Sequence, residues 1–402
     1  MALETAVTFL VAGAASLFMA WSIGAGSSGS TPFAPAVGAN AISVMRAGLV
    51  VGVLGFFGAV LQGANVTEAV GTELIGGVTL TAGAAIVALV TAATLVAVGV
   101  FAGYPIATAF TVTGAVVGVG MAMGGDPAWA KYGEILTLWV LTPFLGGGVA
   151  FLTARALIGD RFPERELTAV LAGAVGVIVA NVGFAALGPD GEAGSLAGTL
   201  GDGLAPGSVD LPVVGAFTVG AVAVSAAVAA LVAAAVFADL GRDRAGAQRR
   251  FLLALGGLVA FSAGGSQVGL AIGPLVPLLD GAAVPLWAVL VGGGVGLLAG
   301  SWTGAPRMIK AISQDYASMG PRRSIAALIP SFAIAQTAVA FGIPVSFNEI
   351  IVSAIVGSGF AAGDAGVSRK KMLYTVLAWI GSLVLALALG FSVYWGVTAL
   401  IG

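Results

Sequence analysis

The sequence lacks cysteine and histidine, two residue types that carry much of redox and metal chemistry, throughout its 402 residues. Their absence excludes disulfides, thiol redox chemistry, imidazole metal sites and histidine-based catalytic triads. Charged residues are scarce at 8%, and the mean hydropathy is +1.07. No G-x-x-x-x-G-K-[ST] phosphate loop occurs, which argues against ATP hydrolysis. This composition excludes a soluble globular domain and predicts an integral membrane protein.

The chain instead has many apolar runs that are long enough to cross a bilayer, which takes roughly 20 residues per helix. We expect about twelve spanning segments. They are 5–23, 47–63, 76–101, 104–123, 132–155, 167–188, 211–237, 251–273, 282–300, 324–341, 343–362 and 372–398. The stretch 23–47 is rich in glycine and proline, so we expect a broken or re-entrant helix there. The predicted fold class is an all-α integral membrane protein.

The basic residues predict the orientation of these segments. With the N-terminus outside and the crossings alternating, all but Lys131 of the 16 basic residues fall inside, as the positive-inside bias requires. The 188–210 loop, which has no Lys or Arg, then lies outside. We therefore expect a multi-pass protein of the cell (plasma) membrane with both termini outside, and the composition is typical of a prokaryotic source.

Landmark residues recur after about 240 positions, which predicts an internal repeat. The pairs are Gly24 and Gly264 (264 − 24 = 240), Pro105 and Pro344 (344 − 105 = 239), and Trp139 and Trp379 (379 − 139 = 240). By the charge count the first copy begins outside and the second inside, so the copies are inverted. We expect a first repeat at 1–155, a linking helix pair with a cytoplasmic linker at 156–250, and a second repeat at 251–402. Inverted repeats place a substrate site near the bilayer midplane, between the halves.

Glycines and prolines inside the apolar segments predict helix breaks that free backbone N–H groups for an anion. The predicted breaks are at Gly24, Gly26, Gly264, Gly265, Pro105 and Pro344. Hydroxyl and amide side chains follow them and are candidate substrate ligands. These candidates are Ser27, Ser28, Ser30, Thr108, Ser266, Gln267, Ser346 and Asn348. The alternative is that Gly and Ser only let helices pack closely; the matching position of the breaks in both halves favours the anion site.

Glu349 is the one acidic residue that falls inside a predicted segment rather than in a loop or at a segment end. A carboxylate within the membrane is energetically expensive and is by default a functional-site hypothesis. It is our candidate for carrying a co-transported proton. The alternatives are a protonated side chain that hydrogen-bonds a neighbouring helix, and a position close enough to the interface to stay hydrated.

Two pairs of motifs resemble those of the inorganic phosphate transporter (PiT) family. The second half reads FSAGGSQVGLAIGP and GIPVSFNEIIVSAIVG; the first reads WSIGAGSSGSTPFAPAVGANAISV and GYPIATAFTVTGAVVGVG. The family has G-A-N-D-V-A-N-A in each half, paired with a downstream G-x-P-V-S-T-T-H. The resemblance covers most of the chain outside 156–250. It implies an inverted-repeat permease that couples phosphate transport to sodium or protons.

The polar positions of these motifs depart from the family. The N-D pair falls on Gly26 and Ser27 in the first half and on Ser266 and Gln267 in the second, so both aspartates are missing. The resemblance implies that those positions bind sodium and phosphate, and their replacement calls sodium coupling into question. Of the later S-T-T-H positions, Thr108 and Ser346 match hydroxyls that the resemblance implies to coordinate the anion. Both family histidines are replaced, by Phe110 and Glu349.

The leading hypothesis is a secondary-active permease for inorganic phosphate, with a proton as the candidate coupling ion. The alternatives are a permease for sulfate or another small anion, and a non-transporting membrane sensor on the same fold. We expect no enzyme activity, no cofactor and no metal centre; a co-transported H⁺ or Na⁺ is the implied ion. The expected partners are the oxyanion and the lipid bilayer but no nucleic acid, and homo-oligomerisation is left open.

Overall fold

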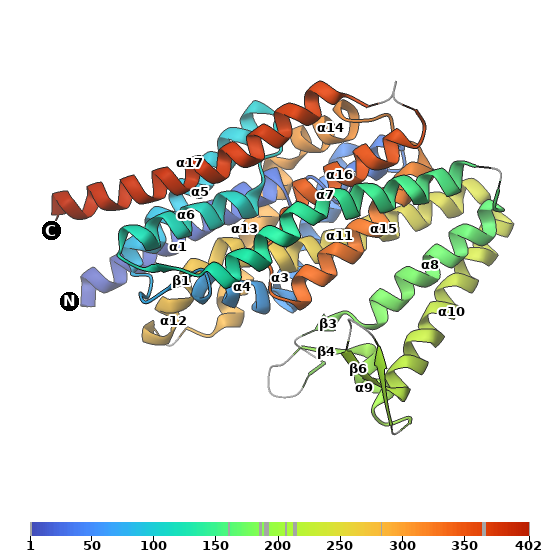
Figure 1. The fold of residues 1–402 in the computed structure, drawn as a ribbon, viewed down its shortest axis with the longest axis horizontal. Helices are drawn as coiled ribbons and strands as arrows, with labels where there is room; N and C mark the ends of the chain where they lie inside the picture. The colour runs from blue at the N-terminus through green and yellow to red at the C-terminus, as the bar shows by residue number, and fades with distance from the viewer. Residues whose placement is uncertain are drawn as a thin grey trace.

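The fold is a bundle of long helices, and the longest connection, between α8 and α10, contains strands and the short helix α9 (Figure 1). The computed structural model describes residues 2–159, 161–184, 187–188, 193–205, 207–211, 215–282, 284–363 and 367–401. Parts of the predicted outer loop 188–210 lie outside these residues. The first helices are α1 (Ala2–Gly26), α2 (Ala34–Gly38), α3 (Val44–Gln62), α4 (Ala64–Thr72), α5 (Ala82–Ala102), α6 (Thr108–Ala122), α7 (Trp129–Ile158) and α8 (Glu164–Ala180). The later ones are α9 (Leu196–Gly201), α10 (Val219–Arg242), α11 (Arg244–Ile272), α12 (Val276–Ala282), α13 (Leu286–Thr303), α14 (Ala305–Asp315), α15 (Pro321–Ala340), α16 (Phe347–Phe360) and α17 (Arg369–Ile401).

Among the residues that the structure describes, strands are confined to three short antiparallel pairs in the connections. They are β1 (Ile75–Gly76) with β2 (Asp126–Pro127), β3 (Gly183–Phe184) with β4 (Gly194–Ser195), and β5 (Ser208–Leu211) with β6 (Gly215–Thr218). Each of the twelve predicted segments overlaps a helix of the described residues, although segments 167–188 and 211–237 also include strand residues. Nine of these helices are long and apolar enough to cross a membrane, while α6 and α16 are shorter apolar helices. The prediction of an all-helical membrane protein is confirmed.

The repeat extends to the secondary structure itself. Helices α6 and α16 begin 239 residues apart (347 − 108), and α7 and α17 begin 240 residues apart (369 − 129). The same spacing relates α5 to α15 (321 − 82 = 239). Helix α7 leads away from the end of the molecule where both termini lie, whereas α17 returns to it (Figure 1). Equivalent helices therefore run in opposite directions, as an inverted repeat requires.

The two repeats interlock instead of packing as separate bodies. Helix α6 of the first repeat packs against α17 of the second, and α7 packs against α16 in the same way. Likewise α1 packs against α13, and α3 against α11. One apolar core cluster consequently contains buried residues from both halves, such as Met19, Val112, Leu255 and Phe347. The interface between the repeats is the centre of the fold.

Glycines in the first helix of each repeat serve close packing, which corrects one of our predictions. Helix α1 continues through Gly24 and ends at Gly26, and α11 continues through Gly264 and Gly265 to Ile272. The predicted helix breaks at Gly24, Gly264 and Gly265 are therefore wrong. A Cβ at Gly24 would overlap the backbone of Leu297 on α13. The missing side chain lets two helices approach, which is the alternative that we had weighed.

Gly264 makes the tightest approach of this kind on α11. A Cβ there would overlap the backbone of Gly55 on α3, and a Cβ at Gly265 would meet the Gln62 side chain. Continuous helix through these glycines is tolerated because interhelical packing offsets their low helix propensity. Helix α11 ends at Ile272, and the 3₁₀ turn Gly273–Leu275 leads from it to α12.

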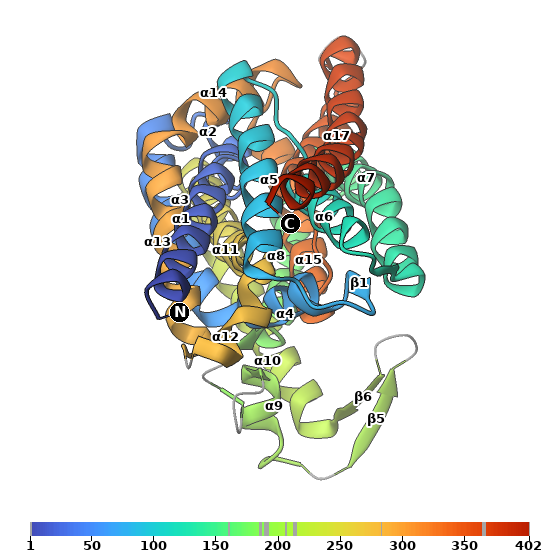
Figure 2. The same ribbon diagram turned by 90° about the vertical axis from the view of Figure 1, so that its left-hand side faces the viewer.

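Helices α8 and α10 form a pair at the side of the bundle (Figures 1 and 2). Glu164 at the start of α8 forms ion pairs with Arg244 on α11 and Arg322 on α15, which ties this pair to the second repeat. The domain boundaries expected at 155 and 250 both fall inside helices, since α7 runs to Ile158 and α11 starts at Arg244. Because these helices continue across the boundary positions, the hydropathy pattern does not mark where one part of the chain ends and the next begins.

The close approach of α11 to α3 predicts that Gly264→Ala destabilises the fold. The added methyl would overlap the backbone of Gly55, and such overpacking costs roughly 1–3 kcal/mol of unfolding free energy. The matched control is Gly148→Ala on α7, where an added Cβ meets nothing within 4 Å. Thermal unfolding of both purified variants in detergent measures the difference. Equal melting temperatures would contradict this interpretation of Gly264.

Candidate substrate site

The site is built around two short helices that begin inside the bundle. Non-helical links, residues 104–107 and 343–346, precede α6 and α16. These links contain Pro105 and Pro344, whose rings cannot donate a backbone hydrogen bond. The Trp379 indole N–H donates to the carbonyl of Pro105 at 2.8 Å, and that of Trp139 donates to Pro344 at 2.9 Å. Each tryptophan thus supports the link of the opposite repeat, which sequence reasoning had not foreseen.

Two amide side chains bind the next carbonyl of each link. Gln267 Nε2 donates to the carbonyl of Val345 at 2.6 Å, and Asn348 Nδ2 donates to that of Ile106 at 2.6 Å. Asn348 Nδ2 also donates to the carbonyl of Gly26, the last residue of α1, at 2.8 Å. Backbone that leaves the helix at membrane depth must find such partners inside the protein. Gln267 and Asn348 therefore help to hold both links in place.

A compact polar cluster lies between the two links. The hydroxyls of Ser27 and Thr108 both donate to Gln267 Oε1, at 3.0 and 2.7 Å, and their oxygens lie 3.3 Å apart. All three side chains are fully buried. Ser27 and Gln267 are equivalent residues of the two repeats (267 − 27 = 240), so equivalent positions touch each other at the interface. The structure thus brings these three predicted residues together.

Several polar groups near this cluster have no hydrogen-bond partner in the described residues. They are the hydroxyls of Ser28, Ser266 and Ser346, and Oδ1 of Asn348. All four side chains are at most 2% exposed. A buried polar group left unpaired costs about 1–3 kcal/mol, so such a concentration of them indicates a place for a polar ligand.

The N-termini of α6 and α16 add further donors. Neither the N-cap residue of α6, Ala107, nor that of α16, Ser346, provides a side-chain cap. The first N–H groups of a helix have no partner within the helix, and the helix dipole makes this end favourable for negative charge. Since the links meet at Gln267, both N-termini begin beside the polar cluster. Two uncapped helix N-termini in this position suit an oxyanion.

Ser30 has a different role from its neighbours. Its hydroxyl donates to the carbonyl of Ser27 at 3.2 Å, and the hydroxyl of Thr31 donates to the same carbonyl at 3.0 Å. Both side chains are used in the turn that follows α1. Ser30 therefore shapes the break after Gly26, and its hydrogen is engaged in this turn rather than offered to a ligand.

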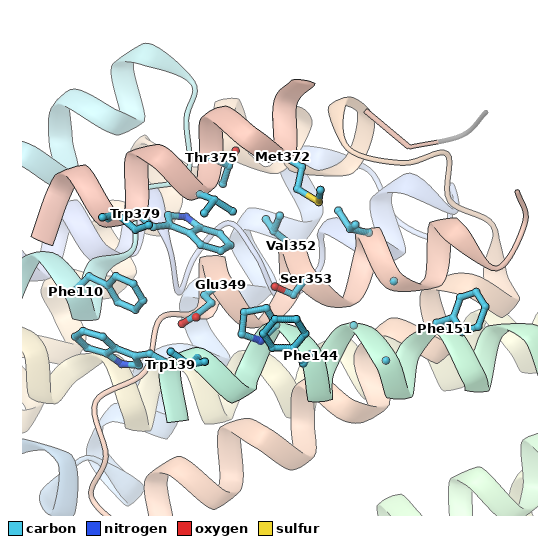
Figure 3. Close-up of a pocket in the computed structure, with 18 of the residues that line it drawn as sticks. Phe110, Trp139, Phe144, Phe151, Glu349, Val352, Ser353, Met372, Thr375 and Trp379 are labelled. Atoms are coloured by element: carbon cyan, nitrogen blue, oxygen red, sulfur yellow. The ribbon is translucent and has the colours of Figure 1, made fainter. Parts of the chain in front are cut away.

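Glu349 lies in the first turn of α16 but faces away from the polar cluster. Its side chain points toward Phe110 and Trp139, into a groove between α7, α16 and α17 (Figure 3). It is 2% exposed, and its Oε2 has no hydrogen-bond partner in the described residues. Its equivalent in the first repeat is Phe110 (349 − 110 = 239), which stacks on Trp139 with ring centroids 3.9 Å apart. Helix α16 thus separates Asn348 and Glu349 onto different faces.

A second buried polar network escaped the sequence analysis. Gln336 Nε2 on α15 donates to Ser262 Oγ on α11 at 2.6 Å and lies 3.3 Å from Oε1 of Gln62 on α3. Gln62 Nε2 also donates to the carbonyl of Gly183 at 2.8 Å. Ser262 stands one helical turn before Ser266 on α11, so polar groups continue along this helix. Amides in or at the end of apolar segments are the signal that could have revealed the network.

Comparisons with known proteins agree with this architecture. The profile of the phosphate transporter family matches residues 23–390. The chain belongs to the phosphate transporter family. This family consists of transporters rather than enzymes, and the resemblance inferred from the paired motifs is confirmed.

Similar proteins cover almost the whole of this family member. It is 27% identical to the chloroplastic inorganic phosphate transporter 2-1 of Arabidopsis thaliana, over 94% of this chain and 70% of that protein. A putative phosphate permease of Thermococcus kodakarensis is 25% identical, over 92% of each chain. A solved structure of a sodium-dependent phosphate transporter superposes with a TM-score of 0.79 at 22% identity, covering 98% of this chain and 100% of that one. That structure has the same fold.

The tryptophan contacts predict that the links of this phosphate transporter family member depend on them. Trp379→Phe leaves the Pro105 carbonyl without its donor, which costs about 1–3 kcal/mol of unfolding free energy. Trp395→Phe on the same helix is the control, because Trp395 is 61% exposed whereas Trp379 is 5% exposed. Thermal unfolding in detergent compares the two. A similar loss of stability in both variants would show that the link does not need this hydrogen bond.

Proposed function

We propose that the protein is a permease that moves inorganic phosphate across a membrane, with the anion bound where Ser27 and Gln267 meet. The contact of these repeat-equivalent residues, between two uncapped helix N-termini, is the observation that carries the proposal. Inverted-repeat transporters bind their substrates at such interfaces of broken helices. The printed names of the relatives, which include phosphate transporters and permeases, support phosphate as the substrate.

The chemistry of the cluster also favours phosphate over sulfate. Ser28, Ser266 and Ser346 have hydroxyls that can donate to any tetrahedral oxyanion. Asn348 Oδ1 can only accept, and its orientation follows from the two backbone carbonyls that bind Nδ2. Phosphate at neutral pH still carries a proton that it can donate to this oxygen, whereas sulfate carries none. The Asn348 Oδ1 acceptor among the serine hydroxyl donors therefore favours phosphate, which carries a proton, over sulfate.

Glu349 gives the permease a route to proton coupling. Its carboxyl lies in the first turn of α16, the helix whose N-terminus begins beside the polar cluster. An ionised Glu349 and a bound anion would compete for the same favourable helix end. Protonation of Glu349 removes this competition, so binding of a proton on the groove side favours binding of phosphate on the cluster side. Such reciprocity is the thermodynamic basis of symport.

The orientation follows from the charge distribution. Basic residues such as Arg244, Arg250 and Arg322 lie at the start of α11 and α15, at the end of the bundle opposite both termini (Figure 1). The positive-inside bias assigns this end to the cytoplasm. We therefore propose that both termini lie outside a prokaryotic cell membrane.

Gln267→Glu tests the anion site. The variant keeps the shape of the side chain but adds a negative charge beside the bound anion, so we expect phosphate affinity to fall about tenfold or more. Asn181→Asp at the C-cap of α8 is the matched control, because Asn181 bonds Ser225 rather than a residue of the cluster and the change also adds one charge. Equilibrium binding of labelled phosphate to purified protein measures both. An unchanged phosphate affinity in Gln267→Glu would show that the anion does not bind at this site.

Glu349→Gln tests the coupling. In proteoliposomes an inward proton gradient should drive accumulation of labelled phosphate by the wild type, while a sodium gradient alone should not. The variant mimics a permanently protonated side chain, so it should retain exchange of phosphate but lose the response to the proton gradient. Glu134→Gln on α7, whose exposed carboxylate pairs with Lys131, serves as the control. Accumulation driven only by sodium would contradict proton coupling.

A further inference from the structure

A groove between α7, α16 and α17 opens beside the polar cluster but is separate from it. Its volume is about 880 Å³, and α16 forms its floor (Figure 3). Val140, Phe144 and Ile380 stand at its rim and are more than half exposed, so the groove opens toward the surrounding lipid. Nearly all of its lining is apolar. A lipid-facing apolar groove of this size can accept a chain that enters from the bilayer.

One ionisable group lies at the base of this groove. Among its described lining residues, Glu349 is the only one with an ionisable side chain; Ser353 and Thr375 add two hydroxyls. The Glu349 carboxyl is almost completely buried, and Oε2 lacks a hydrogen-bond partner there. A carboxyl that is excluded from water and unpaired within the membrane is expensive to keep. The described lining therefore offers no cationic side chain to this carboxyl, and neither hydroxyl bonds its Oε2.

Aromatic rings surround the carboxyl. Phe110, Trp139 and Trp379 lie around Glu349 in Figure 3, and the indole N–H groups of both tryptophans are already bound to the link carbonyls. All three rings line the groove, and the stacking of Phe110 on Trp139 covers one face of each of these two rings. Faces of aromatic rings attract cations, most strongly where water is excluded. Carboxyl and rings together favour an ammonium group over a neutral or anionic one.

We propose that this groove binds a lipophilic amine: the ammonium pairs with Glu349 against the aromatic rings, and an apolar arm lies along α7 and α17. Charge complementarity selects this occupant over a neutral lipid chain, which would leave the carboxyl unpaired. A second copy of the chain would have to bring a cation to the same place. The amine holds Glu349 ionised, so it opposes the protonation on which our proposed coupling depends and inhibits transport.

Binding can be measured without transport, which keeps this inference distinguishable from the proposed function. Purified protein in lipid nanodiscs is treated with dicyclohexylcarbodiimide, a hydrophobic reagent for carboxyl groups in apolar surroundings. The carboxyl O–H adds across one C=N bond, and the acyl group then shifts from oxygen to nitrogen to leave a stable N-acylurea without a leaving group. Mass spectrometry of peptides locates the adduct, which we expect on Glu349 and not in Glu349→Gln.

The amine N,N-dimethyldodecylamine is the probe, and dodecanol is its uncharged match in chain length. We expect the amine to slow labelling of Glu349 about tenfold or more, and dodecanol to have little effect. The amine should also raise the melting temperature of the wild type and of Glu134→Gln, but not that of Glu349→Gln. This second measurement includes a folding check, because each variant reports its own unfolding transition.

Three results would overturn the proposal. Equal protection by dodecanol would show that the groove takes apolar chains regardless of charge, as a neutral lipid would. Protection that grows with protein concentration in the absence of amine would indicate a second copy of the chain. Failure of the carbodiimide to label Glu349 would show that the carboxyl cannot be reached from the bilayer. Phosphate binding at the Gln267 cluster could persist in all three cases.

Discussion

The structure depends on pairing the backbone carbonyls of two non-helical links inside a membrane. A bilayer offers no water to these groups, so any chain that leaves the helix at that depth needs partners from the protein. Trp379 and Trp139 bind the carbonyls of Pro105 and Pro344, and each reaches across from the opposite repeat. The links can exist only where the two repeats meet. The same contacts set the starting points of α6 and α16, and so the place of the candidate site.

The scaffold is symmetric, but its chemistry is not. Helix starts repeat at 239 or 240 residues, and the tryptophan contacts occur in both halves. In contrast, Gln267 faces Ser27, and Glu349 corresponds to Phe110. A symmetric frame places helix N-termini on both sides of one cluster, where neutral donors can surround an anion. The asymmetric residues Gln267, Asn348 and Glu349 all belong to the second half, so the proposed substrate ligand Asn348 and the proposed coupling group Glu349 lie on different faces of α16.

Much of this could be predicted from residue patterns. Apolar runs of membrane-spanning length predicted the segments, since helix formation there depends on length and hydropathy. The pairs Pro105 with Pro344 and Trp139 with Trp379 revealed the repeat. Glycine was a weaker guide. The same residue can end a helix, as Gly26 does, or let two helices touch, as Gly264 does, and only the neighbouring helix decides between these roles.

The sequence by itself determined the class of protein, the repeat, its family and most of the polar residues of the cluster, because these depend on composition, spacing and motif. Tertiary structure alone decided which of them meet. It brought Ser27, Thr108 and Gln267 into contact and engaged Ser30 in a turn. It also pointed the Glu349 side chain into the groove between α7, α16 and α17. Adjacent residues on a helix point about 100° apart, so Asn348 and Glu349 are neighbours in sequence, but one binds the link carbonyl and the other lines the groove.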